Sequence, residues 1–313
     1  MSFLKLKSEK LKHSEVIQIL EENLNKILVG KNLQVRLSLS ALFARGHLLI
    51  EDMPGVGKTT LVQALAKLIQ FEFKRIQFTN DMLPADILGV HIFNETQKKF
   101  EFHPGPIFSE MLLADEINRA TPKTQSALLQ AMEERKVSLD SHVYPLPEVF
   151  FMVGTQNPQE QEGAYPLPES QMDRFLLRIS IGYPDRASER EILLGEDRST
   201  LLENLKPVIT VGQVREIQEQ VKTIKISEAV LNFIQDLATA LRARPGVGIS
   251  PRGVKALLRV SQSWALLEDR SYVTPEDVKV VAPYVLRHRL ILSSEVMGNA
   301  DEVFKEALTS IQA

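Results

Sequence analysis

The residues best suited to do chemistry form a glycine-rich stretch that ends in Gly57-Lys58-Thr59. An apolar run that fits one buried strand, residues 47–50, precedes it, and an amphipathic helical pattern follows. Glycines let backbone N–H groups close around phosphate oxygens, and the helix dipole adds to the attraction. In such a loop Lys58 would reach the β- and γ-phosphates, and the Thr59 hydroxyl would help to hold Mg²⁺. The stretch predicts a nucleoside triphosphate site built from Pro54, Gly55, Val56, Gly57, Lys58, Thr59 and Thr60.

One position departs from the usual phosphate-loop pattern, G-x-x-x-x-G-K-[ST], because Asp52 stands where that pattern has glycine. Aspartate tolerates left-handed backbone angles better than most residues, so we expect the turn to survive. The alternative is a chance Gly-Lys-Thr on a surface turn, which the flanking strand and helix patterns disfavour.

A second apolar run, residues 111–115, ends in the acid pair Asp115-Glu116. If this run lies beside the strand that precedes the phosphate loop, Asp115 can bind Mg²⁺ through its water shell. Glu116 can then orient and deprotonate an attacking water. Strands often end in solvated acids, so the pair is informative only together with Lys58 and Thr59. We interpret Asp115 as a metal-site residue and Glu116 as catalytic.

Two further residues could contact the reacting end of a nucleotide. Asn157 directly follows another buried apolar run, residues 149–153, and its amide could hydrogen-bond the nucleophilic water. An ordinary turn before Pro158 is the alternative. Arg252 stands at a helix start, where a cation opposes the dipole, and an anionic ligand would explain it.

Arg174 directly precedes a fifth candidate strand, residues 175–179. An exposed arginine there could reach a phosphate bound by a neighbouring subunit, as an arginine finger supplied in trans. The alternative is a salt bridge to Asp173 or Glu169.

The composition excludes several classes of protein. A chain of 313 residues suits about two domains, and its formal net charge of -3 provides no global positive field for nucleic acid. The absence of cysteine excludes disulfides, thiolate metal sites and cysteine nucleophiles. No apolar run approaches the ~18 residues of a membrane span, and residues 1–12 lack the apolar centre of a signal peptide. We therefore expect a cytoplasmic location.

Hydrophobic periodicity predicts the elements that position these residues. Continuous apolar runs separated by amphipathic helical patterns are typical of parallel strands covered on both faces. The candidate strands are residues 47–50, 73–78, 111–115, 149–153 and 175–179. Two helices precede them, the first capped by Ser14 and the second ending near Arg45 with Gly46 as its C-cap. The sequence predicts an α/β fold, with a P-loop core of parallel sheet sandwiched by helices over residues 1–185.

The pattern changes at residue 186, where strand signals stop. Helix-start signals then recur at Ser188, Thr210, Ser250-Pro251 and Thr274-Pro275. We expect residues 186–313 to form an all-helical lid domain. Within the core, residues 90–102 and 137–144 are predicted to be β-hairpins, which are either surface decoration or loops that project into a ring channel.

Taken together, these motifs resemble the MoxR family of AAA+ ATPases. The resemblance extends from about residue 27 to about residue 290 and rests on six segments, residues 51–60, 83–89, 115–120, 156–158, 163–175 and 250–252. It implies Walker A at Gly55, Gly57, Lys58 and Thr59, Walker B at Asp115, the catalytic acid Glu116, sensor 1 at Asn157, the arginine finger Arg174 and sensor 2 at Arg252. It also implies that Val29 and Gly30 contact the adenine, and that the hairpins are the helix-2 insert and the pre-sensor-1 hairpin. MoxR-like proteins often carry an acid at the position of Asp52.

The resemblance implies a homo-hexameric ring that hydrolyses ATP with Mg²⁺ and remodels a client protein. Such chaperone-like proteins commonly act in the maturation of metal-dependent enzymes, with partners that contain a von Willebrand factor A domain. One alternative is a nucleic-acid motor, but Lys98, Lys99 and His142 provide few cations at the hairpin tips. Another is an ATP-gated scaffold, which the presence of Glu116 and Arg174 disfavours. Whether sensor 2 acts in cis or in trans stays open in the sequence.

Overall fold

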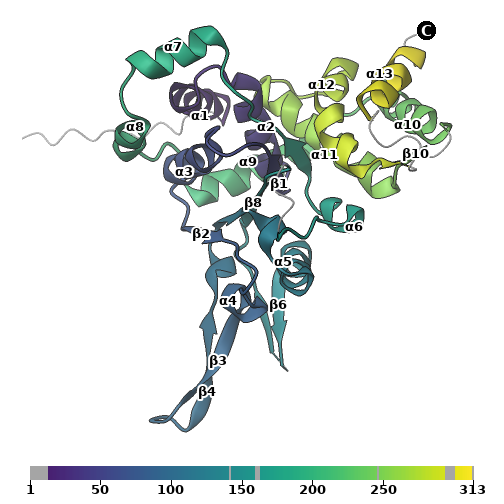
Figure 1. The fold of residues 1–313 in the computed structure, drawn as a ribbon. Helices are drawn as coiled ribbons and strands as arrows, with labels where there is room; N and C mark the ends of the chain where they lie inside the picture. Colours follow the sequence, from purple (N-terminus) through teal and green to yellow (C-terminus); the bar gives the residue numbers. More distant parts are fainter. Residues whose placement is uncertain (1–12, 141, 159–162, 245–246, 293–299, 312–313) are drawn as a thin grey trace, which may run out of the picture.

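The computed structural model describes residues 13–140, 142–158, 163–244, 247–292 and 300–311. Its centre is a five-stranded parallel sheet in the order β2-β5-β8-β1-β9 (Figure 1). The strands are β1 (Leu48–Glu51), β2 (Phe73–Gln77), β5 (Met111–Asp115), β8 (Phe151–Gln156) and β9 (Leu177–Ile179). The predicted α/β fold with a parallel sheet is thereby confirmed.

Helices cover both faces of the sheet, because successive strand residues point in opposite directions. Leu48 and Ile50 of β1 belong to one core and Leu49 belongs to the other, and all three are fully buried. The helices of the core are α1 (His13–Ile27), α2 (Asn32–Phe43), α3 (Lys58–Ile69), α4 (Pro84–Leu88), α5 (Pro122–Glu134) and α6 (Glu169–Met172), with 3₁₀ turns at Pro106–Phe108 and Ile117–Arg119. Parallel strands bring their carboxyl ends to one edge, so the segments after β1, β5 and β8 meet there.

The predicted end of α2 is wrong by about two residues. The helix ends at Phe43, and Arg45 takes the left-handed conformation, with φ of 55°, that we expected of Gly46. Gly46 is required for a different reason, since a Cβ at this position would lie 2.2 Å from Leu176 Cδ2. The glycine is therefore required by a close contact with the chain that leads into β9.

Two predicted helix starts are also wrong. Ser14 lies inside α1, whose described part begins at His13. Ser188 lies inside α7 (Arg186–Leu194), where the side chain of Asp185 accepts a hydrogen bond from Ser188 N at 2.7 Å. Because Asp185 follows Pro184 in extended conformation and accepts this bond, it is the better N-cap.

A mostly helical region follows the core, as the predicted fold class requires. Besides α7 it contains α8 (Arg198–Asn204), α9 (Val211–Thr223), α10 (Glu228–Arg242), α11 (Pro251–Leu267), α12 (Pro275–Leu286), a 3₁₀ turn (Arg287–Arg289) and α13 (Ala300–Ser310). The caps at Thr210, Ser250 and Thr274 are confirmed. A ribbon of β10 (Val247–Gly248) and β11 (Ile291–Leu292) was not predicted, because strands of two residues leave no periodic pattern. The domain boundary at residue 185 stays a prediction. None of the helices within the described ranges is long and apolar enough to cross a membrane.

Both predicted hairpins are present and extend away from the body of the protein (Figure 1). They are β3 (Gly89–Asn94) with β4 (Lys99–Pro104), and β6 (Lys136–Leu139) with β7 (His142–Pro145). Ser141, which falls between β6 and β7 in the sequence, lies outside the described residues. His91 joins the two hairpins, with Nδ1 2.9 Å from Asp140 Oδ2 and Nε2 3.0 Å from the Tyr144 hydroxyl.

Candidate nucleotide-binding site

The phosphate loop connects the end of β1 to the start of α3. Gly55 and Gly57 have φ of 81° and 97°, a region in which a side chain would strain the backbone. α3 begins at Lys58, so its unpaired N–H groups and its dipole face the loop. Lys58 Nζ donates to Asp52 O at 2.7 Å, within the same loop. These residues fit a triphosphate, because the loop offers backbone donors, a helix N-terminus and an ammonium group together.

Asp52 holds the loop in place through its side chain. Its Oδ2 accepts hydrogen bonds from Ser180 Oγ at 3.0 Å and from Gly182 N at 2.6 Å, and its Oδ1 accepts from Met53 N at 2.9 Å. Asp52 does not have a positive φ, so left-handed tolerance is not the reason for an aspartate here. The carboxylate instead ties the phosphate loop to the chain that leaves β9.

A cavity of about 340 Å³ lies beside the phosphate loop. Its lining combines Val29 and Lys31 with Gly55, Val56, Gly57 and Thr60 of the loop, and with Tyr183, Ile192 and Arg198 of the chain that enters the lid. Gly30 has φ of 72°, and a Cβ there would lie 2.2 Å from Ser188 Oγ, so only glycine permits this approach to α7. Val29 therefore lines the cavity next to the phosphate loop, whereas Gly30 packs against α7, and their contact with the base stays a prediction.

The acid pair lies at the carboxyl end of β5, beside Thr155 of β8. The Thr155 hydroxyl donates to Asp115 Oδ1 at 2.5 Å and accepts from Glu116 N at 3.0 Å. Asp115 Oδ2 also accepts from Arg75 Nη2 at 2.6 Å, and Glu116 has φ of 57°. Thr155 was not among the predicted site residues. The available signal was a hydroxyl in an otherwise apolar strand, and the structure shows it fully buried.

Asn157 follows β8 at the same edge of the sheet and is 6% exposed. It lines a cavity of about 420 Å³ together with Glu51, Asn118 and Gln156. Gln156 Nε2 donates to Glu51 Oε1 at 2.8 Å, so the ends of β8 and β1 are joined there. The structure thus brings the phosphate loop, Asp115, Glu116 and Asn157 to one edge.

A Mg²⁺ ion is compatible with these residues only as a partner of the nucleotide. Within the described ranges no group of three or more His, Asp or Glu side chains could hold a metal ion. Thr59 and Asp115 would contribute one hydroxyl and one carboxylate, while phosphate oxygens and water complete the octahedron that Mg²⁺ requires.

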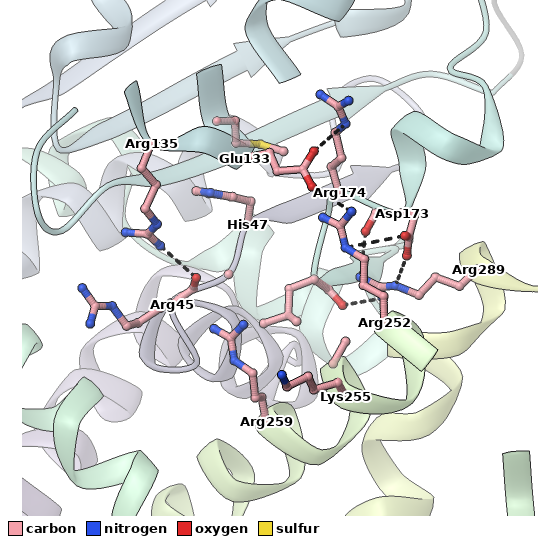
Figure 2. Close-up of a pocket in the computed structure, with 14 residues that line it drawn as sticks. Arg45, His47, Glu133, Arg135, Asp173, Arg174, Arg252, Lys255, Arg259 and Arg289 are labelled. Carbon is pink, nitrogen blue, oxygen red and sulfur yellow. Dashed lines mark hydrogen bonds and ion pairs between the residues drawn. The ribbon is translucent and has the colours of Figure 1, made fainter. Parts of the chain in front are cut away.

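Arg174 and Arg252 lie together, away from the protomer's own phosphate loop. β1 and β9 are parallel, with Leu48 opposite Leu177, so Arg174 precedes β9 at the edge opposite to the loop that follows β1. Arg174 Nε is 3.1 Å from Glu133 Oε2, and Arg252 Nη1 is 2.8 Å from Glu133 Oε1 (Figure 2). The predicted alternative for Arg174, a salt bridge to Asp173 or Glu169, is wrong in its partner, because Arg174 pairs with Glu133.

These two arginines line a cavity of about 230 Å³ that is rich in cations. Arg135 Nη2 donates to Arg45 O at 3.0 Å (Figure 2). Arg259 Nη2 donates to Ala44 O. Burial, and then repulsion from neighbouring arginines, lowers the pKa of both Arg135 and Arg259. Since cations favour helix C-termini, Arg135 and Arg259 are accounted for as caps of α2. Arg174 is different, because its buried Nη1 has no hydrogen-bond partner.

Comparison with known proteins agrees with this arrangement. Residues 47–177 match the model of the ATPase family associated with various cellular activities (AAA), and residues 237–307 match the AAA lid domain. The protein YeaC of Bacillus subtilis is 45% identical over 93% of this chain and 92% of its own length. The chaperone MoxR1 of Mycobacterium tuberculosis is 39% identical over 90% of this chain and 76% of its own length.

A crystal structure from Cytophaga hutchinsonii superposes with a TM-score of 0.84 at 36% identity, covering 95% of this chain and 94% of that one. The MoxR protein of Methylorubrum extorquens is 31% identical over 87% of this chain and 86% of its own length. Since the core and the lid both match and MoxR relatives are 31–39% identical over most of the chain, the chain belongs to the MoxR family of AAA ATPases.

Proposed function

We propose that this protein hydrolyses ATP at sites shared between neighbouring copies in a ring, and that it uses the energy to remodel a client protein. The observation that carries the proposal is the separation of Arg174 and Arg252 from the protomer's own phosphate loop. Because they lie at the opposite edge of the sheet, they are placed to serve the nucleotide of a neighbour. The same geometry favours action in trans for Arg252 as well as for Arg174.

In this mechanism the phosphate loop and Lys58 bind the triphosphate, while Thr59 and Asp115 would hold Mg²⁺, which neutralises phosphate charge when bound. Glu116 orients the attacking water and accepts its proton, and Asn157 aligns the same water. Arg174 from the next protomer offsets the negative charge of the transition state.

A client protein is a better fit to the hairpins than a nucleic acid. Large apolar side chains of the hairpins are exposed, namely Val90, Ile92, Phe93, Phe100 and Val143. A nucleic-acid channel requires cations along the phosphate backbone, whereas the second hairpin presents Asp140. The name of the relative MoxR1 also supports a chaperone-like role. The homo-hexameric ring, the von Willebrand factor A domain partner and the maturation of a metal-dependent enzyme belong to the same proposal and rest on the family resemblance.

The decisive experiment measures ATP turnover over a series of protein concentrations, with the mass determined in parallel with and without ATP. Specific activity should rise as the ring assembles, and Glu116→Gln should bind ATP while losing turnover. Flat specific activity from a persistent monomer would contradict the shared site. Normal turnover by Glu116→Gln would contradict the role of Glu116.

A further inference from the structure

A buried arginine of the lid donates several hydrogen bonds to the segment that carries Arg174. Arg289 lies in the 3₁₀ turn after α12 and is 7% exposed. Its Nε donates to Asp173 Oδ1 at 2.7 Å, and its Nη2 donates to Asp173 O at 3.2 Å. Its Nη1 donates to Leu176 O at 2.9 Å. One guanidinium group of the lid therefore holds the chain on both sides of Arg174.

The residue before it adds a further contact to the same segment. His288 is 3% exposed, and its Nε2 lies 3.0 Å from Phe175 O. A carbonyl only accepts hydrogen bonds, so Nε2 carries the proton and donates. Burial, followed by repulsion from Arg289, lowers the pKa of His288 well below its usual value, so the ring is neutral. His288 and Arg289 together bond every residue from 173 to 176 except Arg174 itself.

Arg289 also supports Arg252. Asp173 accepts from Arg289 through Oδ1, and its Oδ2 lies 3.6 Å from Arg252 Nε (Figure 2). Next to Arg252, Gly253 packs so closely that a Cβ there would lie 3.1 Å from Arg289 Cδ. The two arginines placed to serve a neighbour thus share one anchor, although one precedes β9 of the core and the other begins α11 of the lid.

From these contacts we infer that Arg289 is a positioning residue that fixes Arg174 and Arg252 as one unit. It does not line the cavity beside the protomer's own phosphate loop. Its guanidinium fork sets the position of the Arg174 backbone relative to the lid, so that a displacement of the lid moves both arginines together. This inference rests on the proposed function, because it requires a neighbour's nucleotide for the two arginines to serve.

A purely structural role for Arg289 predicts a different result, so the test needs a variant that keeps the charge. Arg289→Lys retains a cation beside Asp173 but lacks the planar fork through which Arg289 donates to Asp173, Phe175 and Leu176. We expect nucleotide affinity of its own phosphate loop to be unchanged and kcat to fall about tenfold or more, because a displaced catalytic group loses its alignment. Arg270→Lys is the matched control. Arg270 also pairs with an acid of the lid, Asp277, at 2.7 Å, and does not hold the Arg174 segment.

Mixing variants separates positioning from loss of folding. A Glu116→Gln protomer cannot hydrolyse ATP but carries an intact Arg174 unit, so adding it to Arg289→Lys should raise turnover above that of Arg289→Lys alone. The double variant Glu116→Gln with Arg289→Lys should give no rise. If Arg289→Lys is too unstable to purify, Asp173→Asn, which keeps the shape of the anchor, is tested in the same mixture.

The outcomes separate the two proposals. An inactive wild type, or Arg174→Ala that keeps full turnover, overturns the proposed function. A different set of results overturns the positioning role alone. In that set the wild type is active and its Arg174→Ala variant is rescued by Glu116→Gln, but Arg289→Lys either keeps full turnover or is not rescued.

Discussion

Thr155 Oγ donates to Asp115 Oδ1 at 2.5 Å and at the same time accepts the backbone N–H of Glu116. One buried hydroxyl on β8 therefore sets the orientation of both acids at the end of β5. This contact joins the strand that carries Asn157 to the strand that carries the acids, so their mutual geometry does not depend on loop conformation.

Thr155→Val keeps the shape of the side chain and removes both hydrogen bonds. An unsatisfied buried N–H costs about 1–3 kcal/mol, and a misplaced Glu116 should lower kcat about tenfold or more. Nucleotide affinity should change little, because the phosphate loop is untouched. Steady-state turnover and titration with a fluorescent nucleotide measure the two quantities, and Thr155→Ser should restore turnover. Equal kcat for Val and Ser would show that the hydroxyl does not orient Glu116.

Arg174→Ala removes the group that we place against the neighbour's nucleotide. Loss of an arginine finger lowers turnover by about 10³–10⁵-fold, whereas binding to the protomer's own phosphate loop should persist. Turnover measured at a concentration where the ring is assembled checks this. Arg215→Ala removes an exposed arginine that pairs with Glu148 and should leave the rate unchanged. An unaltered rate for Arg174→Ala would exclude it as the finger.

In the isolated protomer Glu133 forms ion pairs with Arg174 and Arg252. A neighbour's phosphate must therefore compete with Glu133 for these two arginines. Half-exposed ion pairs contribute about 0.2–1 kcal/mol each, so Glu133→Gln should shift ATP-dependent assembly to a protein concentration about two- to tenfold lower. Sedimentation over a dilution series measures the midpoint. Glu134→Gln is the control, because Glu134 contacts Lys136 instead. A midpoint that moves upward would mean that Glu133 aligns the arginines for the neighbour.

Stability should fall on acidification partly because of His47. Burial, followed by repulsion from Arg135, lowers its pKa to about 3, and its Nδ1 accepts from Met152 N at 3.0 Å. Below pH of about 6.5 the unfolded chain binds a proton that the folded imidazole does not, so the free energy of unfolding decreases as pH falls. The contribution reaches about 1.4 kcal/mol per pH unit until the pH approaches 3.

His47→Asn, whose Oδ1 can accept from Met152 N, should flatten this dependence between pH 6 and pH 4. Urea unfolding of both proteins over that range gives the two slopes, and the comparison cancels the carboxylates that they share. Identical slopes would mean that His47 does not titrate differently in the two states.

The sheet and one edge of the site were predictable because they depend on local pattern. Continuous apolar runs identify buried parallel strands, and polar residues that directly follow such strands must meet at one edge, as Asp115 and Asn157 do. The phosphate loop was equally accessible, since its geometry requires glycines in sequence before Lys58.

The Arg289 anchor and the role of Glu133 could not be predicted from pattern. The partners Glu133, Asp173, Arg252 and Arg289 come from four separate elements, and only tertiary packing brings them together. The predicted role of Gly46 at the end of α2 was wrong for the same reason, because a tertiary contact with Leu176 is what requires a glycine there. That Asp52 leaves the site active stays a prediction, and the bonds that explain an aspartate there, to Ser180 and Gly182, involve chain far along the sequence.

The Asp52 carboxylate directly connects the phosphate loop, in which a nucleotide would bind, to the chain that enters the lid. The link is direct because Gly182, which donates to Asp52, lies shortly before α7. In the proposed ring, binding of a nucleotide would be coupled through this link to the lid of the same protomer. Cleavage of that nucleotide would be coupled through Arg174 to the adjacent copy, so each lid would respond to two nucleotides, its own and its neighbour's.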